Sequence, residues 1–418
     1  MTTATATPAR AGGARPRLVT YPLLLRFAIT LGASVSFYLL LSVVPLYARL
    51  AGPGGANGAA GLATGALMFS TVAGELVTTR LTARFGYRRT LAAGLILLGA
   101  PALALTASPT LPMILAVCVV RGLGFAITVV AGGAVTASLI PAERRGEGLA
   151  LAGVVSGVPA LVALPLGVWL AGHLGYGPVF AAGAIAALAA LPALPGLPDR
   201  PAGHRARRPA GPPAAGPVPD DAARPLGVLA ALRTAALLRP ALVFAATTVA
   251  AGIIVTFLPL ALSRGSSGVA ALALFAQPAA ATLTRWLSGR WGDRRGAGRL
   301  VMPGLAAAAL GMLIMALTGV PVAVVAGSVI FGAGFGVAQN ASLSLMYDRV
   351  PASGYDAVSA LWNLSYDAGM GLGAVGFGLL AGGTGYPVAF AVTAAAMLIA
   401  LIPARRDQRA ARPAASRE

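Results

Sequence analysis

The sequence predicts an all-α membrane protein in which twelve transmembrane helices form two pseudo-symmetric six-helix bundles. Of the 418 residues, 57% are hydrophobic and only 10% are charged, whereas about 25% of the residues in a soluble protein are charged. Apolar runs close to the ~20 residues that cross a bilayer recur along the chain. Short arginine-bearing loops separate these runs. A soluble core could not bury so much apolar surface, so lipid is the expected solvent.

The chain divides into five expected segments. Residues 1–21 lack apolar periodicity and are expected to form a disordered cytoplasmic tail. Residues 22–197 are the first bundle, and residues 237–404 are the second. Between them, residues 198–236 are rich in proline, alanine, glycine and arginine, which predicts a flexible cytoplasmic linker. Residues 405–418 form a second basic tail that we expect to be disordered and cytoplasmic.

Each expected span is an apolar run of membrane-crossing length, and the longer runs imply tilted helices. In the first bundle, the spans are expected at residues 24–48, 59–81, 90–107, 111–139, 147–171 and 176–197. In the second bundle, they are expected at residues 239–262, 267–288, 298–318, 321–346, 355–381 and 385–403.

The net charge of +19 indicates orientation rather than a nucleic-acid partner. Almost all arginines lie in the tails and in the loops on one side of the spans, and the positive-inside bias places that side in the cytoplasm. Both termini are therefore expected to be cytoplasmic, in the plasma (inner) membrane. No aromatic patch for stacking bases accompanies the arginines, so nucleic-acid binding is not expected. The single cysteine, Cys118, and the distant His173 and His204 predict neither a disulfide nor a metal site.

A basic loop occurs once in each half of the chain, at residues 80–89 and 289–295. Aligning the two loops pairs Arg84 with Arg290, Gly86 with Gly292, Arg88 with Arg294 and Arg89 with Arg295. Spans further along the chain match at a constant offset of 210 residues, with Gly122, Gly124 and Phe125 matching Gly332, Gly334 and Phe335. A parallel repeat of this kind predicts two bundles related about the membrane normal.

These patterns resemble the major facilitator superfamily over essentially the whole chain. The family's loop signature, Gly-x-x-x-Asp-Arg-x-Gly-Arg-Arg, is matched at Arg84, Gly86, Arg88 and Arg89. Thr79 and Ala83 stand where the family has Gly and Asp, and Gly289 stands at the Asp position of the second copy. Arg121 begins a run of spaced glycines similar to the family's fourth-span signature. The resemblance implies alternating access, with the basic loops acting as gates at the inner ends.

Ionisable side chains inside a bilayer cost about 2.5–3.5 kcal/mol on insertion scales, so each one is a functional candidate. Arg121 and Asp367 lie near the middle of their spans. Arg121 is either part of a substrate or coupling site or a structural charge bound to backbone carbonyls. Asp367 is either a proton-accepting carboxylate or one half of a salt bridge. Glu75 lies closer to the inner end than Arg121, so the two are not expected to pair. In the family fold Glu75 faces span eleven, where it could replace the missing loop Asp as a gate, or it could contact nearby arginines.

Uncharged polar residues gather in the second half. Asn363, Tyr366 and Asp367 follow i, i+3, i+4 spacing and therefore share one helix face. Gln277 and Asn340 are further polar residues inside predicted spans. An amide, a phenol and a carboxylate on one face are suited to a watery substrate path, although hydrogen bonding between helices would use the same residue types.

Together these features predict a monomeric secondary active transporter that moves a small organic solute through the lipid bilayer by alternating access. No phosphate-binding loop for ATP is present, so no cofactor is expected and protons are the expected energy source. Efflux of an amphipathic compound is favoured over uptake of a sugar or amino acid. An enzyme would need a catalytic cluster at one interface, and a membrane sensor would need a large extra-membrane domain. Neither is visible in the sequence.

Overall fold

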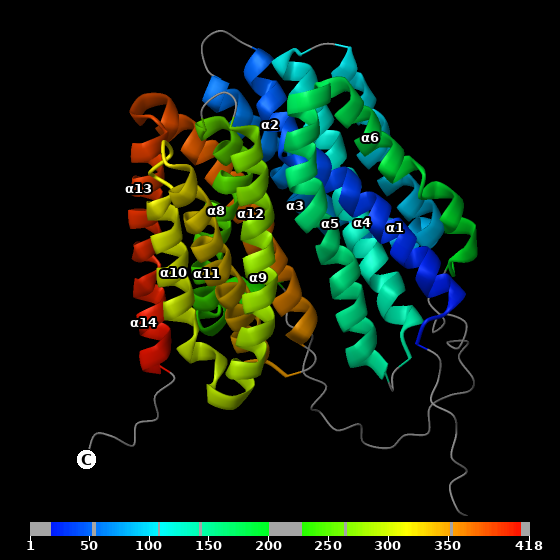
Figure 1. The fold of residues 1–418 in the computed structure, drawn as a ribbon. Helices are drawn as coiled ribbons and strands as arrows, with labels where there is room; N and C mark the ends of the chain where they lie inside the picture. The colour runs from blue at the N-terminus through cyan, green and yellow to red at the C-terminus, as the bar shows by residue number, and fades with distance from the viewer. Residues whose placement is uncertain are drawn as a thin grey trace, which may run out of the picture.

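A computed structural model of the chain describes residues 18–51, 56–107, 109–141, 144–199, 228–262, 266–351 and 354–410. These residues form helices and no strand, and the helices gather into two bundles that lie side by side (Figure 1). The first bundle contains α1 Tyr21–Leu41, α2 Val43–Ala48, α3 Ala56–Gly99, α4 Leu111–Leu139, α5 Arg145–Leu174 and α6 Tyr176–Leu188. Short 3₁₀ helices follow α2, α3 and α6, at Arg49–Ala51, Ala100–Thr106 and Leu191–Gly196.

The second bundle contains α7 Val228–Arg233, α8 Ala235–Ala261, α9 Ser267–Arg295, α10 Val301–Ile314, α11 Pro321–Tyr347, α12 Tyr355–Thr384, α13 Tyr386–Ile399 and α14 Leu401–Ala410. A 3₁₀ turn, Ala297–Arg299, joins α9 to α10. Proline occupies the first turn of α1, α4, α11 and α13, where its missing N–H has no partner in the helix to lose.

The predicted all-α membrane fold with twelve spans in two bundles is confirmed. Eleven helical segments in the described residues are long and apolar enough to cross a membrane. One of them, Asn57–Thr106, is 50 residues long and contains two helices joined at Gly86, where φ is 79° and ψ is 171°. Only glycine adopts these angles readily. The segment therefore supplies spans two and three, so the described residues contain twelve spans.

The two bundles turn at equivalent glycines. Within the described residues, positive φ occurs only at Gly86, Gly175, Gly296 and Gly385, which form two pairs separated by 210 residues. This register corrects the expected alignment of the second basic loop, because Gly292 lies inside α9 and the turn comes at Gly296. Arg290, Arg294 and Arg295 also belong to α9. The alignment on Gly292 is wrong because arginine and glycine recur there in the same order as in the first loop.

Three expected segment boundaries differ from the helices. Residues 228–236 were expected in the linker, but α7 and the start of α8 occupy them, and Ala231 is buried against α8, α11 and α12. α14 continues to Ala410, beyond the expected end of the bundle at residue 404. α1 begins at Tyr21, inside the expected tail. In the sequence, proline-rich or basic neighbours obscure where these helical segments begin and end. Residues 1–17, 200–227 and 411–418 of the expected tails and linker lie outside the described residues.

The bundles pack tightly at one end, which is the upper end in Figure 1. Thr64 Oγ1 of α3 lies 2.9 Å from Thr256 Oγ1 of α8, and the Tyr386 hydroxyl lies 2.5 Å from Oδ1 of Asn57. Gly61 of α3 contacts α12 so closely that a Cβ there would overlap the Ala374 carbonyl oxygen. Small residues let the two backbones approach in this way.

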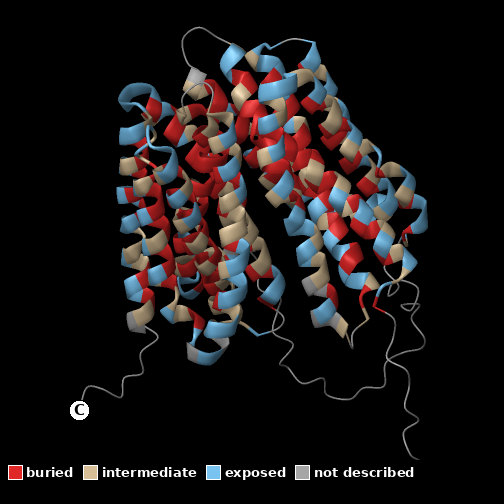
Figure 2. Ribbon diagram, viewed as in Figure 1, coloured by how far each residue is buried: buried red, intermediate tan, exposed pale blue. Residues whose placement is uncertain are grey.

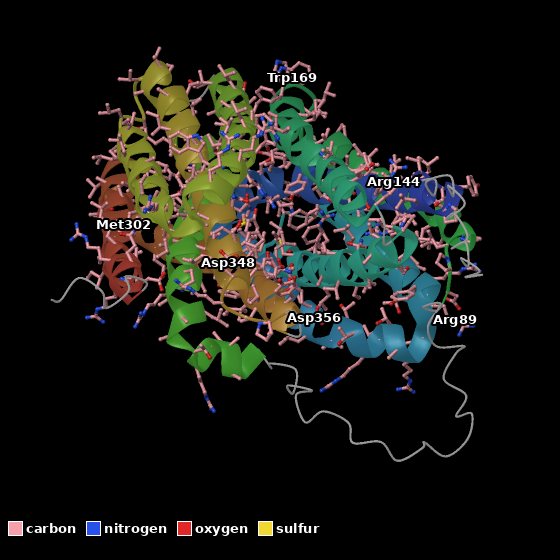
Figure 3. All side chains as sticks on the ribbon, turned by 90° about the horizontal axis from the view of Figure 1, so that it is seen from below. Arg89, Arg144, Trp169, Met302, Asp348 and Asp356 are labelled. Atoms are coloured by element: carbon pink, nitrogen blue, oxygen red, sulfur yellow. The ribbon has the colours of Figure 1, made fainter. Side chains whose placement is uncertain are left out.

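At the opposite end, the facing halves of the bundles are exposed. Figure 2 shows exposed and intermediate residues over the lower parts of α5 and α9. A Cβ added to Gly153 or Gly157 of α5 would have no neighbour within 4 Å. Figure 3 views the molecule from this end, which carries Arg89 and Asp356. The bundles are therefore packed together at one end of the spans and open to one another at the other end.

Candidate functional site

Two carboxyl groups from different bundles meet where the packed end gives way to the open end. The side chains of Glu75 in α3 and Asp367 in α12 lie close enough to form a hydrogen bond when one of the two carboxyl groups is protonated. Asp367 is only 8% exposed, and Glu75 is half-buried. Two ionised carboxylates repel one another, whereas one proton would let the two groups form a hydrogen bond.

Helix packing brings these carboxyl groups together. A Cβ on Gly371 of α12 would lie 3.1 Å from the Met68 Cβ of α3, so the two backbones are close at this level. From there α3 runs about 10 Å to Glu75, and α12 runs back about 6 Å to Asp367, at 1.5 Å per residue. Both steps lead toward the open end, so the carboxyl pair lies on the open side of the α3–α12 seam.

Two phenols lie near the carboxyl pair, and a guanidinium lies near one of these phenols. Tyr38 of α1 is within electrostatic range of Asp367 and of Tyr366. Tyr366 in turn interacts with Arg285 of α9. Arg285 is not among the residues predicted from the sequence. The signal was available, because Arg285 lies 210 residues after Glu75 and so occupies the same position in the second bundle.

The predicted polar face of α12 is present and adjoins an aromatic wall. Asn363 and Tyr366 are half-buried beside Asp367. The Trp362 ring stacks on Phe244 of α8 at 4.5 Å between centroids, and Trp362 Nε1 donates a hydrogen bond to Ser342 Oγ at 3.4 Å. Asn363, Tyr366 and Asp367 therefore lie together on α12 beside the rings of Trp362 and Phe244, and a role for this face in the substrate path stays a prediction.

Gln277 and Asn340 lie within the second bundle, away from the described contacts of the carboxyl pair. Gln277 is 7% exposed, and its backbone packs against Gly332 of α11. The Asn340 side chain approaches Gly289, where a Cβ would lie 3.7 Å from Nδ2. Both residues therefore contribute to α9–α11 packing, and a role for either in the substrate path stays a prediction.

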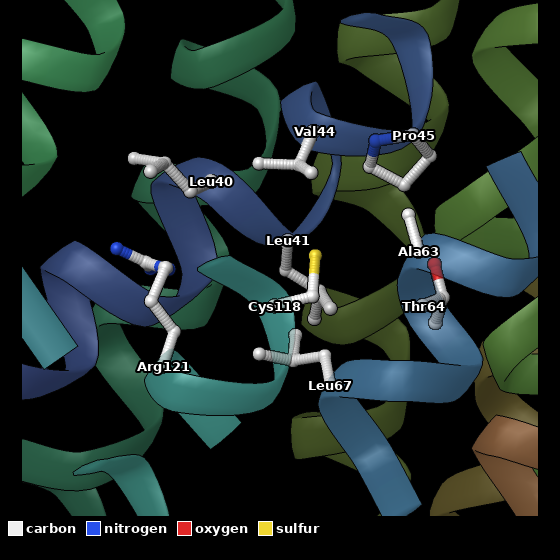
Figure 4. A pocket seen from close by; sticks show the side chains of 9 residues that line it. All are labelled: Leu40, Leu41, Val44, Pro45, Ala63, Thr64, Leu67, Cys118 and Arg121. Carbon is white, nitrogen blue, oxygen red and sulfur yellow. The ribbon is translucent and has the colours of Figure 1, made fainter. Parts of the chain in front are cut away.

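Arg121 is held by backbone carbonyls inside the first bundle. Its Nη1 donates to the Leu98 carbonyl at 2.7 Å and its Nη2 to the Ser36 carbonyl at 3.0 Å. These contacts match the structural alternative considered for Arg121, and Glu75 bonds to Asp367 rather than to Arg121. Arg121 also lines a small cavity between α1, α2, α3 and α4 (Figure 4). The other lining residues are Leu40, Leu41, Val44, Pro45, Ala63, Thr64, Leu67 and Cys118.

A second buried arginine, Arg26, was missed because it lies near the predicted start of span one. It is 4% exposed. Its Nε donates to the Gly132 carbonyl at 2.9 Å, and its Nη1 donates to Thr30 Oγ1 at 2.7 Å. Gly132 makes room for this side chain, because a Cβ there would overlap the guanidinium.

The first basic loop is bound to its own bundle. Arg88 Nε donates to the Leu197 carbonyl at 2.6 Å. Asp199 accepts hydrogen bonds from the Arg88 N–H on Oδ1 at 3.1 Å and from the Tyr87 N–H on its carbonyl at 3.0 Å. The segment after span six therefore supplies a carboxylate to the first basic loop. That loop lacks one of its own, because Ala83 stands at the family's Asp position. Asp199 was missed because it falls in the expected linker.

The other predicted gate arginines lie at the open end without meeting across the bundles. Arg84 lies over the Phe85 ring at 5.3 Å, and Arg290 lies over the Trp286 ring at 4.5 Å. Arg89 and Arg294 are exposed. The side chain of Arg295 lies outside the described residues. A gating role for these residues stays a prediction.

The 210-residue register also reassigns the acidic position of the second loop. Asp293, and not Gly289, is the counterpart of Ala83. The second copy therefore keeps the Asp of the loop signature, followed by Arg294 and the turn at Gly296. The alignment on Gly292 is four residues out of register and conceals this match.

Comparison with known proteins agrees with this geometry. The sequence profile described as Major Facilitator Superfamily matches residues 26–374 and, in a second match, residues 241–418. No curated protein sequence matches the chain.

Several solved structures share the fold. One is a bacterial homologue of the human lysosomal transporter Spinster, inward-facing and unoccupied. It is 15% identical in sequence, with a TM-score of 0.72, and the match covers 93% of this chain and 96% of that chain. An auto-inhibited peptide transporter of the POT family is 13% identical, with a TM-score of 0.75 and coverage of 96% and 99%. The xylose transporter XylE from E. coli, in a partially occluded inward-open conformation, is 13% identical, with a TM-score of 0.71 and coverage of 95% and 99%.

At these identities the solved structures show the fold, and the sequence profile shows the family because it covers most of the chain. The chain belongs to the Major Facilitator Superfamily and is a multi-pass secondary transporter of a small solute that works by alternating access, not an enzyme.

Proposed function

We propose that this transporter couples the efflux of a small organic solute to the entry of protons, as a monomer in the plasma (inner) membrane. The observation that carries the proposal is the close approach of the Glu75 and Asp367 carboxyl groups across the two bundles. A hydrogen bond between these groups needs one proton. Because each bundle supplies one carboxyl group, the presence of that proton depends on how the bundles are arranged.

The proton stabilises the packed arrangement of α3 and α12. When the proton leaves, Glu75 and Asp367 become two carboxylates at hydrogen-bond distance. They repel one another unless a cation replaces the proton or the helices separate. Loss of the proton thus favours either a loaded site or a different arrangement of the bundles. A proton site that senses the conformation is what coupling to alternating access requires.

The arginine distribution supports the proposed orientation. The positive-inside bias places the basic loops, both termini and the open end in the cytoplasm. A solute from the cytoplasm then reaches the site while the bundles are open at this end, and a proton reaches it from the other side after the bundles rock. Protons moving down their gradient into the cell would drive the solute outward.

Gradient-driven flux in proteoliposomes tests this function. The probes share one aromatic body: trimethyl(2-naphthylmethyl)ammonium, naphthalene-2-sulfonamide and naphthalene-2-sulfonate, which are cationic, neutral and anionic. An imposed pH gradient is expected to drive at least one of them against its concentration gradient. Asp367→Asn and Glu75→Gln are expected to abolish the response to the pH gradient.

Asp356→Asn is the matched control, because this carboxylate is exposed in the first turn of the same helix. It is expected to leave coupled flux unchanged. The proposal fails if none of the three probes responds to the pH gradient, or if Asp367→Asn still couples normally.

A further inference from the structure

Three exposed arginines gather at the open end of the second bundle. Arg405 and Arg406 belong to α14, and Arg299 belongs to the turn before α10. None of the ion pairs formed by the described residues includes any of these three side chains. The three cations are therefore open to a negatively charged partner from outside the chain.

The only acidic residue of α14 is already paired. Asp407 accepts hydrogen bonds from both Nη atoms of Arg349 of α11, at 2.8 and 2.7 Å. Arg349 also donates to the Ala236 carbonyl of α8. These bonds hold α14 against α8 and α11. They also commit the Asp407 carboxylate to Arg349, so the positive charge of Arg405 and Arg406 stays uncompensated.

A hydrogen bond brings the arginine of the α9–α10 turn next to those of α14. Gln408 Nε2 donates to the Gly298 carbonyl at 3.0 Å, and Gly298 directly precedes Arg299. Arg405 precedes Gln408 by three residues, and residues three apart are neighbours on a helix surface. Arg405 and Arg299 therefore lie on the same side of α14.

The two helices that lead to these arginines present apolar stripes to lipid. α10 and α13 pack against each other and form the side of the second bundle that faces away from the first bundle (Figure 1). Exposed apolar residues recur along both helices at spacings of three, four or seven residues, so each set forms one stripe. They are Val388, Val392, Ile399 and Ile402 along α13 and α14, and Leu310, Leu313 and Leu317 along α10 and just after it. In a membrane-spanning chain such a surface contacts acyl chains.

The length of the α13–α14 stripe places the arginines at the level of the lipid headgroups. Arg406 follows Val388 by eighteen residues, which is about 27 Å along a helix. The hydrocarbon core of a bilayer is about 30 Å thick. Ile402, one turn before Arg406, is 52% exposed and still apolar. With the stripe in the hydrocarbon, Arg406 therefore reaches the phosphates of the leaflet at the open end.

We infer that this edge of the second bundle binds an anionic phospholipid from the leaflet at the open end. The acyl chains lie on the stripes of α10 and α13, and the phosphate accepts hydrogen bonds from Arg299, Arg405 and Arg406. Guanidinium groups suit this role because two of their N–H groups can meet two phosphate oxygens. Three cations exceed the charge of one phosphate, so a headgroup with net negative charge binds better than one that also carries an ammonium group.

This inference depends on neither the solute nor the coupling of transport. With the proposed orientation of the chain, the leaflet concerned is the cytoplasmic one. An anionic lipid there would bridge α14 and the α9–α10 turn, two segments that otherwise meet through the bond between Gln408 and Gly298.

Lipid competition on the purified full-length protein in detergent tests the inference. Palmitoyl-oleoyl phosphatidylglycerol and palmitoyl-oleoyl phosphatidylcholine have the same acyl chains and differ in net charge. Native mass spectrometry counts the lipids that stay bound when both are offered in equal amounts. The first lipid bound is expected to be phosphatidylglycerol. Removing one arginine is expected to weaken its binding about fivefold.

The double variant Arg405→Gln/Arg406→Gln is expected to weaken phosphatidylglycerol binding about 25-fold and to change phosphatidylcholine binding little. Both side chains are exposed, so the variant is expected to fold, and its thermal unfolding temperature without lipid checks this. Arg405→Lys/Arg406→Lys keeps both charges and is expected to keep the preference for phosphatidylglycerol. The matched control is Arg89→Gln/Arg233→Gln, which removes two exposed arginines of α3 and α7 at the same end. This control is expected to bind phosphatidylglycerol as the wild type does.

The inference is overturned if the two lipids bind equally well, if Arg405→Gln/Arg406→Gln keeps the wild-type preference, or if the control variant loses as much of it. Inorganic phosphate at millimolar concentration separates a lipid site from a site for a free anion. It is expected to leave phosphatidylglycerol bound, and displacement of the lipid by phosphate would overturn the assignment to lipid. Gradient-driven flux tests the proposed function separately.

Discussion

The close contact between Gly61 and α12 provides a way to shift the transporter between its two arrangements. In Gly61→Leu, the new Cβ overlaps the Ala374 carbonyl oxygen. This oxygen is part of the α12 backbone and cannot move aside as a flexible side chain can. Overpacking of this kind costs about 1–3 kcal/mol. The gain in helix propensity, about 1 kcal/mol, is the same in both arrangements and cancels. The balance is therefore expected to move about 5- to 150-fold away from the arrangement packed at this end.

Spin-label distances measure this shift. The chain has one cysteine, Cys118, which is buried, so Cys118→Ala provides a background without reactive thiols. Labels are attached through Gly177→Cys in α6 and Gly383→Cys in α12, where added side chains meet no neighbour within 4 Å. Both positions lie at the packed end, on different bundles. Gly61→Leu is expected to add a population with a longer distance between the labels.

Gly58 is the matched control, because it lies one turn earlier in α3 and has open space around it. Gly58→Leu is expected to leave the distance distribution unchanged. A folded Gly61→Leu protein with the wild-type distribution would refute the idea that close packing at this end limits the opening of the bundles.

Three further sets of substitutions test what holds each bundle together. Gly86→Ala and Gly296→Ala each force a side chain into a backbone region reserved for glycine, which costs about 1–3 kcal/mol. Both are expected to lower the thermal unfolding temperature in detergent, Gly86→Ala more so because Cβ would also approach a carboxylate oxygen at 2.8 Å. Asp407→Asn breaks a two-point ion pair to Arg349, with distances of 2.8 and 2.7 Å. The pair is largely buried, so a loss of about 1.5–3 kcal/mol is expected by the same measurement, and a cycle including Arg349→Gln would show no coupling energy if the pair is unimportant. Arg121→Gln removes two hydrogen bonds from a charged donor to buried carbonyls, at about 1.5–3 kcal/mol each; a variant with wild-type stability that fails to transport would instead place Arg121 in the transport mechanism.

The positions of the spans and the existence of two halves could be predicted from the sequence. In lipid a helix must satisfy its backbone hydrogen bonds within its own segment, so a span is a local property of length and composition. The face that Asp367 shares with Tyr366 and Asn363 also followed from local spacing, and a role of Asp367 in coupling stays a prediction. The second basic loop was misaligned because arginine and glycine recur there every few residues, and only the turn at Gly296 set its register.

Contacts between distant segments depended on the tertiary structure. Residues 75 and 367 are far apart in the chain, and the close approach of their carboxyl groups depends on how α3 and α12 pack. Arg121 and Asp367 look alike in the sequence, as single charges in apolar spans. Packing joins Asp367 to a carboxyl group and directs Arg121 to carbonyl oxygens. By itself, the sequence determined which segments cross the membrane and which of them carry charge. The structure decided which charges meet, because hydropathy is read along one helix while a contact depends on the facing surfaces of two.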